Sequence, residues 1–169
     1  NISHADTTAF TLIACNGEDP SPMGATGSIS HVWIHANEIL DYKWEGIDIF
    51  AGAGESNSLI EDVVIEDNTF TALDITKGQA LFIYAGGCSN CTRPSDNNQI
   101  LDLVIRNNIV NSNDFIFMYG GMEEFASNNL VTYYLGENTL NPIDAKIDIA
   151  DFMAKENAGN QTIALEEMP

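Results

Sequence analysis

Basic residues are scarce in this chain. Its 169 residues include six Lys and Arg against 25 Asp and Glu, so the formal net charge is −19 at pH 7. Nucleic acids and anionic membranes bind proteins through basic patches that replace counterions. We therefore expect neither nucleic acid nor a membrane surface as a partner. An acidic polysaccharide would also be repelled unless cations bridged the two surfaces.

Long apolar runs are missing as well. No stretch approaches the roughly 18 consecutive apolar residues of a transmembrane helix, so we expect no membrane insertion. The length and the 44% hydrophobic content fit one domain with a continuous core. No acidic run has the spacing of an EF-hand or of a calcium-binding nonapeptide. We expect the acidity to serve solubility or a salty exterior, with cation binding, calcium included, as the alternative.

Cysteine is too rare for a disulfide scaffold, and its count is odd: Cys15, Cys88 and Cys91. Cys88 and Cys91 have the spacing of a redox motif, but their loop is rich in Gly, Asn and Pro, whereas an activated thiolate is expected at a helix start. We expect a local disulfide or inert thiols. A redox site or a zinc pair is the alternative, and a zinc pair would lack two further ligands.

A signal peptide is absent too, which suggests a mature product or a fragment. Sequons of the type N-x-[ST] at Asn1, Asn90 and Asn160 are compatible with secretion. We expect an extracellular or cell-surface protein.

What the chain does contain is an internal repeat. Four segments share apolar residues at positions 1, 4, 6 and 11, and they are 29–39, 60–70, 100–110 and 130–140. Position 9 is asparagine in all of them: Asn37, Asn68, Asn108 and Asn138. The separations of 31, 40 and 30 residues indicate a period near 30, with one insertion at residues 86–99.

Alternation within each repeat predicts a strand. Val32 and Ile34 are two residues apart, as are Val63 and Ile65, so each pair would point into the same core. Asparagine tolerates the left-handed conformation of a sharp bend, and its amide can bond the same amide one rung above and below. The four repeat asparagines are therefore expected to form a ladder.

A second strand precedes a small-residue turn in three repeats, at 46–52, 80–86 and 115–120. Residues 11–17 fit the same strand in a preceding, incomplete rung. Asn1 would then occupy the ladder position, so we expect the chain to begin within a rung.

These patterns resemble the right-handed parallel β-helix of the pectate lyase-like superfamily across residues 1–149. The resemblance implies an all-β solenoid of about five rungs. It also implies that the G-I-x-I strands form a first sheet, the V-x-I strands a second, and the short strands after the asparagines a third. The superfamily includes lyases, hydrolases, epimerases, tailspikes and adhesins, so the fold does not decide the activity.

Residues 150–169 depart from the repeat and are expected to form a C-terminal capping tail. We expect a short helix at 151–157 and a last strand at 162–165 within it. Solenoids need caps because a terminal rung offers unpaired backbone groups. No matching N-terminal cap is evident, which suggests that residues outside this chain or another subunit cover that end.

In family members that act on polysaccharides, the cleft lies over the first sheet. There, residues 44–49 resemble a polygalacturonase strand, T-D-G-I-D, and this resemblance makes Glu45 and Asp48 candidate catalytic carboxylates. The next rung has Gln79 instead of paired acids, and no Gly-His-Gly or Arg-x-Lys element follows. We favour the alternative, in which both acids are outward-facing residues of a loop and a strand edge.

A lyase would need an Arg or Lys base, and calcium or a positive group to neutralise the sugar carboxylate. Lys43, Lys77 and Arg93 lie in suitable loops but are isolated in an acidic chain. We expect them to be solvated loop residues.

Histidine offers little more. His31 and His35 should project from one face of the second sheet, beside Asp62, Glu66 and Arg106. We expect surface ion pairs there and no metal site, because metal ligation would be incomplete.

The alternation also places apolar side chains on the outside. If the first-sheet core residues are Ile47, Ile49, Leu81, Ile83, Phe115 and Phe117, the outward residues are Asp48, Phe50, Phe82, Tyr84, Ile116 and Met118. The second sheet would carry an outward column of Trp33, Val64, Val104 and Tyr134. Such stripes usually mark an interface.

Three interpretations of these stripes stay open. Loops and the tail would cover one stripe, another subunit or domain would cover it, or aromatic rings would bind sugar. The candidate binding residues are Trp44, Phe50, Phe82, Tyr84 and Met118. We expect an extracellular β-helix for structure, self-association or binding, without a complete catalytic set. The alternative is a polysaccharide lyase or glycoside hydrolase, or a fragment of one.

Overall fold

Strands of this chain pair in parallel with strands one repeat away. The computed structural model describes residues 2–3, 7–14, 27–52, 56–87, 95–121, 126–152 and 159–169. They form an all-β solenoid of about four turns, where the resemblance implied about five rungs. Within these ranges, no helix has the length and apolar character needed to cross a membrane.

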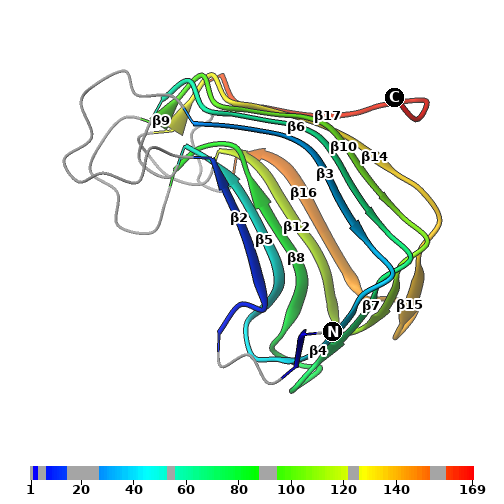
Figure 1. Ribbon diagram of the computed structural model, residues 1–169. Coiled ribbons are helices and arrows are strands. Elements are labelled where there is room, and N and C mark those ends of the chain that lie inside the picture. Colours follow the sequence, from blue (N-terminus) through cyan, green and yellow to red (C-terminus); the bar gives the residue numbers. More distant parts are fainter. Residues whose placement is uncertain are drawn as a thin grey trace.

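Three five-stranded sheets form the walls of the solenoid, and their strands lie side by side in chain order (Figure 1). The first sheet contains β2 (Phe10–Ala14), β5 (Glu45–Ala51), β8 (Gln79–Tyr84), β12 (Asp114–Gly121) and β16 (Lys146–Phe152). The second contains β3 (Ser28–His35), β6 (Leu59–Glu66), β10 (Gln99–Arg106), β14 (Leu130–Leu135) and β17 (Gln161–Ala164). The third contains β1 (Ile2–Ser3), β4 (Glu38–Tyr42), β7 (Thr69–Ala72), β11 (Ile109–Asn111) and β15 (Thr139–Asn141). A small fourth sheet pairs β9 (Ser95–Asp96) with β13 (Ala126–Ser127).

The core lies between the three walls. Ile47 and Ile49 of β5 are fully buried, as the alternation predicts, and so are Val63 and Ile65 of β6. Each such side chain contributes about 1.5–3 kcal/mol when it leaves water. Stacked apolar columns therefore supply most of the driving force for this fold.

The predicted phase of β12 is wrong. Ile116 and Met118, expected outside, are fully buried, whereas Phe117 is half-buried. The register pairs Ile116 with Leu81 and Met118 with Ile83, which are both core residues.

Phe115 explains the error. Alternation alone would align it with the first isoleucine of β5, but the register places it level with Ala80 at the strand start. Ala80 and Phe115 are themselves buried, so the beginning of each strand contributes two consecutive residues to the core. Counting from the first apolar residue of β12 therefore shifted the phase by one.

Hydrogen bonds join the repeat asparagines from rung to rung. The Nδ2 atoms of Asn37, Asn68 and Asn108 donate to the Oδ1 of the next asparagine at 3.2, 3.1 and 3.0 Å. Their backbone N–H groups donate to the same oxygens at 2.9, 3.0 and 2.9 Å. The run ends at Asn138, whose Nδ2 donates to the carbonyl of Gly136 at 3.0 Å.

The left-handed bend, however, is not at these asparagines. It lies one residue earlier, at Ala36, Asp67 and Asn107, whose φ angles are 52°, 55° and 55°. Among residues other than glycine, Asp and Asn adopt this conformation most readily. The bend precedes the asparagine, whose side chain then reaches the neighbouring rung.

A second asparagine column was missed by the sequence reasoning. The N–H groups of Ser58, Asn98 and Asn129 donate to the Oδ1 of Asn98, Asn129 and Asn160 at 2.8, 2.8 and 3.1 Å. The 31-residue spacing of these three asparagines matches the repeat period and is the signal that could have revealed them.

Glycines at the ends of the first-sheet strands make room for this column. A Cβ on Gly52 would lie 2.2 Å from Asn98 Oδ1, and a Cβ on Gly86 would lie 2.2 Å from Asn129 Nδ2. Gly52 also has a φ of 65°. Gly52 and Gly86 are therefore required by the asparagines beside them.

The second column also bears on the predicted sequons. Asn160 is 1% exposed, and its Nδ2 donates to the Ala126 carbonyl at 2.9 Å, so it is inaccessible to glycosylation in the folded chain. Asn1 and Asn90 lie outside the described residues, and so do Cys15, Cys88 and Cys91.

The C-terminal tail continues the stack. β16 runs across the predicted boundary at residue 150, so Asp151 and Phe152 are strand residues where a helix was expected. Residues 153–158, the rest of that predicted helix, lie outside the described residues. The predicted last strand is present as β17, which pairs in parallel with β14 at one edge of the second sheet.

Candidate functional site

The outer face of the first sheet gathers aromatic side chains from neighbouring rungs. Register pairs Phe50 with Tyr84, Tyr84 with Tyr119, and Phe82 with Phe117. Ring centroids lie 5.0 Å apart for Phe50 and Tyr84, 5.4 Å for Phe82 and Tyr84, and 6.4 Å for Phe82 and Tyr119. Three predicted binding residues, Phe50, Phe82 and Tyr84, thus belong to one cluster of rings.

These rings cover one another. Phe50 and Tyr84 are nearly parallel, with an interplanar angle of 3°, and their separation is close to the strand spacing of about 4.8 Å. Their planes therefore stack along the solenoid, and Tyr84 is only 6% exposed. The cluster offers few open ring faces to a ligand.

The other two predicted binding residues lie elsewhere. Met118 is in the core because of the phase of β12, and Phe117 takes the outward place, with Lys146 Nζ 4.4 Å from its ring centroid. Trp44 lies between β4 and β5 and is 52% exposed. Lys43 Nζ is 6.0 Å from the Trp44 ring centroid, at the outer limit of a cation–π contact.

The two predicted catalytic carboxylates lie beside this cluster and share one partner. Thr8 Oγ1 is 2.7 Å from Glu45 Oε2 and 3.3 Å from Asp48 Oδ2. Gln79 Nε2 donates to Glu45 Oε1 at 3.4 Å. The rung that has Gln79 in place of paired acids thus supplies an amide that donates a hydrogen bond to Glu45.

Asp48 is the unusual member of the pair. The pKa of Asp48 is raised to about 7, chiefly by burial and then by the negative charge of Glu45, while the Thr8 hydroxyl opposes both effects. Asp48 Oδ1 is buried without a hydrogen-bond partner among the described residues. A buried carboxylate oxygen of this kind favours the neutral acid.

The shared hydroxyl lies closer to Glu45 than to Asp48. A threonine hydroxyl carries one proton, which Thr8 donates to Glu45 across the shorter contact. The longer contact, from Thr8 Oγ1 to Asp48 Oδ2, is the one through which the hydroxyl opposes the raised pKa of Asp48. The arrangement places a carboxyl group whose pKa is raised to about 7 beside a second carboxyl group.

The predicted lyase bases have local contacts. Lys77 Nζ lies 3.1 Å from Asp74 Oδ2 within its own turn, and Lys43 lies over Trp44. Arg93 lies outside the described residues.

The outer face of the second sheet carries a charged network. Glu66 is 8% exposed, and its Oε2 accepts from Arg106 Nε at 2.7 Å while its Oε1 accepts from Trp33 Nε1 at 2.9 Å. The Arg106 hydrogen bond is the main reason that the pKa of Glu66 is held below its ordinary value. His35 Nδ1 lies 3.9 Å from Glu66 Oε1, and His31 Nε2 lies 3.6 Å from Asp62 Oδ2. The structure thus brings together the groups that sequence reasoning placed beside the histidines.

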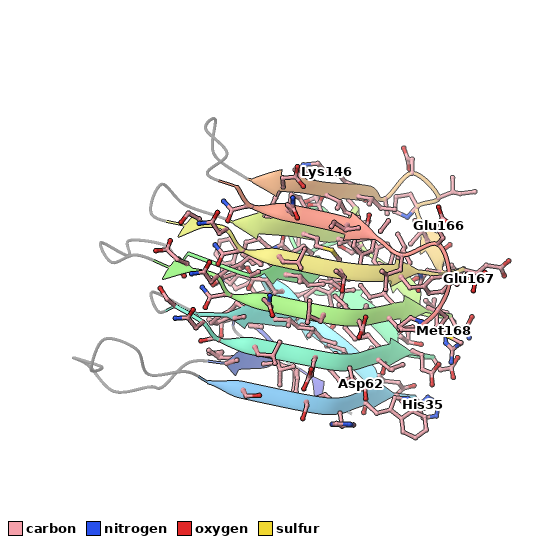
Figure 2. The ribbon with its side chains drawn as sticks, turned by 90° about the horizontal axis from the view of Figure 1, so that it is seen from above. His35, Asp62, Lys146, Glu166, Glu167 and Met168 are labelled. Atoms are coloured by element: carbon pink, nitrogen blue, oxygen red, sulfur yellow. The ribbon has the colours of Figure 1, made fainter. Side chains whose placement is uncertain are left out.

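The C-terminal residues lie over part of this face. Figure 2 shows Glu166, Glu167 and Met168 beyond β17, on the side where Asp62 and His35 lie. A pocket of 580 Å³ is lined by Met168 together with Asp62, Asp102 and Val104. Val104 is 4% exposed, whereas Trp33 of the same predicted column is 65% exposed. The C-terminal tail therefore lies beside the buried Val104, whereas the Trp33 side chain remains exposed to solvent.

Comparisons with models of protein families, with curated proteins and with solved structures found no match for this chain.

Proposed function

We propose that this chain is a non-catalytic, extracellular or cell-surface β-solenoid of the pectate lyase-like type that self-associates through the outer face of its first sheet. The observation that carries the proposal is the ring cluster of Phe50, Phe82, Tyr84, Phe117 and Tyr119 across β5, β8 and β12. Tyr84 and Tyr119 are buried within the cluster, and its half-buried members, Phe50, Phe82 and Phe117, form the apolar surface open to a partner.

Ring geometry favours a protein partner over a glycan. A pyranose stacks on an open aromatic face. Here the faces of Phe50 and Tyr84 cover each other, so mainly ring edges are left for contact. Ring edges can still be buried by another apolar protein surface.

Charge makes this face the more favourable place for contact with a second copy. Two chains of net charge −19 repel each other, and repulsion is smallest where carboxylates are fewest. Two columns of paired residues cross this face, one of Phe50, Tyr84 and Tyr119 and the other of Phe82 and Phe117. Neither column contains a charged side chain between Asp48 of β5 and Asp148 of β16.

Sedimentation velocity tests this proposal. Phe82→Asp adds a carboxylate to the ring cluster and should shift the particle towards monomer, and the milder Phe82→Ser should weaken association without adding charge. The matched control is Ile109→Asp, because Ile109 is 43% exposed on β11 of the third sheet. Circular dichroism checks that each variant is folded. Identical profiles for the wild type and both Phe82 variants would remove the first-sheet interface.

A second candidate function is polysaccharide hydrolysis, and the Glu45–Thr8–Asp48 arrangement favours it. Asp48 would protonate the leaving sugar oxygen, and Glu45 would act as nucleophile or base. The assay is release of reducing ends from neutral and anionic polysaccharides, with and without calcium. Turnover that both Asp48→Asn and Glu45→Gln abolish would establish this function. If no polysaccharide in the panel is hydrolysed, self-association remains as the proposed function.

A further inference from the structure

The outward edge where β3 and β6 end brings a nitrogen ligand and two carboxylates together. His35 Nδ1 lies 3.3 Å from Asp67 Oδ2 and 3.9 Å from Glu66 Oε1. One ligand atom from each of the three residues lies within 4.8 Å of the others. Figure 2 shows His35 at the end of its strand, on the outside of the solenoid. His35 and Asp67 are open to solvent, with side chains 39% and 47% exposed.

These separations match those of ligands around one small cation. Zinc binds imidazole nitrogen and carboxylate oxygen at about 2.0–2.2 Å, which makes the ligand–ligand edge of a tetrahedron roughly 3.3–3.5 Å. The contact between His35 and Asp67 already has this length, and the contact between His35 and Glu66 needs a small movement. The geometry points to a site for a borderline divalent metal ion such as zinc, held by His35, Glu66 and Asp67 with one position left for water.

Neighbouring side chains orient these ligands, as partners of metal ligands usually do. Arg106 Nε donates to Glu66 Oε2 at 2.7 Å, which leaves Oε1 directed towards the cluster. Trp33 Nε1 donates to one lone pair of Oε1 at 2.9 Å, and a second lone pair is available. The Trp33 ring stacks on the His35 ring at 4.7 Å with an interplanar angle of 24°.

Backbone geometry places the third ligand. Asp67 has a φ of 55° at the bend that follows β6, and the adjacent Glu66 pairs with His35 across the strands. The bend sets two consecutive carboxylates beside one imidazole. A calcium ion would instead call for six to eight oxygen ligands, which this cluster does not provide.

The experiment is isothermal titration of the full chain with zinc chloride after its thiols have been blocked by alkylation. Blocking removes zinc binding by the three cysteines. One site per chain is expected, with zinc affinity well above calcium affinity. His35→Ala and Asp67→Asn should each weaken zinc binding about tenfold or more. Asp67→Asn keeps a residue that tolerates the left-handed bend.

His31→Asn is the matched control. His31 lies on the same strand and the same face, 3.6 Å from Asp62, with a φ of 59° that asparagine also accepts. This variant should retain the wild-type affinity. Trp33→Phe keeps a ring over His35 but removes the N–H donor to Glu66, and it should weaken zinc binding less than His35→Ala. No zinc binding by the alkylated chain, or equal losses in His31→Asn and His35→Ala, would overturn the site. The result is independent of the first-sheet interface, because these residues lie on the second sheet.

Discussion

Asp48 on the first sheet and Glu66 on the second are both carboxylates on outward positions of the same solenoid, yet their pKa values move in opposite directions. Glu66 is nearly buried and Asp48 is half-buried, and burial acts to raise the pKa of each. The pKa of Asp48 is raised to about 7, yet that of Glu66 is lowered. Asp48 faces Glu45 and one hydroxyl, whereas Glu66 has Arg106 and the Trp33 N–H. Burial therefore dominates the pKa of Asp48, which has no cationic partner among the described residues, whereas the hydrogen bond from Arg106 outweighs burial at Glu66.

The largest effect should come from removing the cation from the Glu66 network. Arg106→Met leaves a nearly buried carboxylate with one neutral donor, and we expect a loss of about 2–3 kcal/mol in the free energy of unfolding. Urea denaturation at neutral pH measures it. Lys77→Met is the control, since Lys77 and Asp74 form an exposed pair, and it should leave stability unchanged.

A double variant sharpens this test. Arg106→Met combined with Glu66→Gln removes the unpaired charge and should recover part of the lost stability. If the double variant is less stable than Arg106→Met alone, the comparison between the two carboxylates is wrong, because charge pairing would not be the cause.

A neutral buried group extends the comparison. Asn108 is 0% exposed and both donates and accepts within its column. Asn108→Ala, like Asn68→Ala, should cost about 1–3 kcal/mol because amide partners on the next rungs lose their bonds. Asn111→Ala, which removes the half-buried amide that bonds Thr71 at 3.0 Å, should cost less. Unchanged melting of Asn68→Ala and Asn108→Ala would refute the stabilising role of the column.

The smallest effect is a pH dependence from Asp48. Its pKa is higher in the folded chain than the ordinary value of 3.8. Stability from this group is therefore fully present below about pH 4 and is lost as the pH rises through about 7. Because Asp48 is partly exposed, we expect a loss of about 1–2 kcal/mol up to about pH 8, absent in Asp48→Asn.

Thermal melts of the wild type and Asp48→Asn across this pH range measure the difference. Glu45→Gln should weaken the dependence, since it removes the neighbouring negative charge. Parallel stability profiles for the wild type and Asp48→Asn would show that Asp48 titrates in its ordinary range.

Repetition explains why the architecture was predictable from sequence. The apolar spacing around Asn37, Asn68, Asn108 and Asn138 correctly assigned strands to three parallel sheets, because each rung repeats the same environment. The phase of β12 was not predictable by alternation, because Phe115 is an additional core residue at the strand start. The second asparagine column was visible as a 31-residue spacing but has no conspicuous apolar pattern around it.

The candidate site was harder to predict, because its properties depend on contacts between rungs. Glu45 and Asp48 were identifiable from their segment, but the pKa of Asp48 depends on its depth and on Thr8, 40 residues earlier. His35 and Glu66 could be placed side by side from the repeat, whereas the approach of Asp67 depends on a left-handed bend one residue before the expected place. Local sequence does not contain these distances.

The two asparagine columns also determine where this chain can change its length. Asn98 precedes Asn108 by ten residues and Asn129 precedes Asn138 by nine, so the second-sheet segment between the columns is nearly constant. A longer span leads from an asparagine of the first column to the second-column asparagine of the next rung. Its length varies, with 30 residues from Asn68 to Asn98 and 21 from Asn108 to Asn129. Both columns lengthen together, to 40 residues, across the rung that carries the insertion. Evolution can therefore elaborate loops on one side of this solenoid, and a protein engineer can graft them there, while every rung stays aligned with its neighbours.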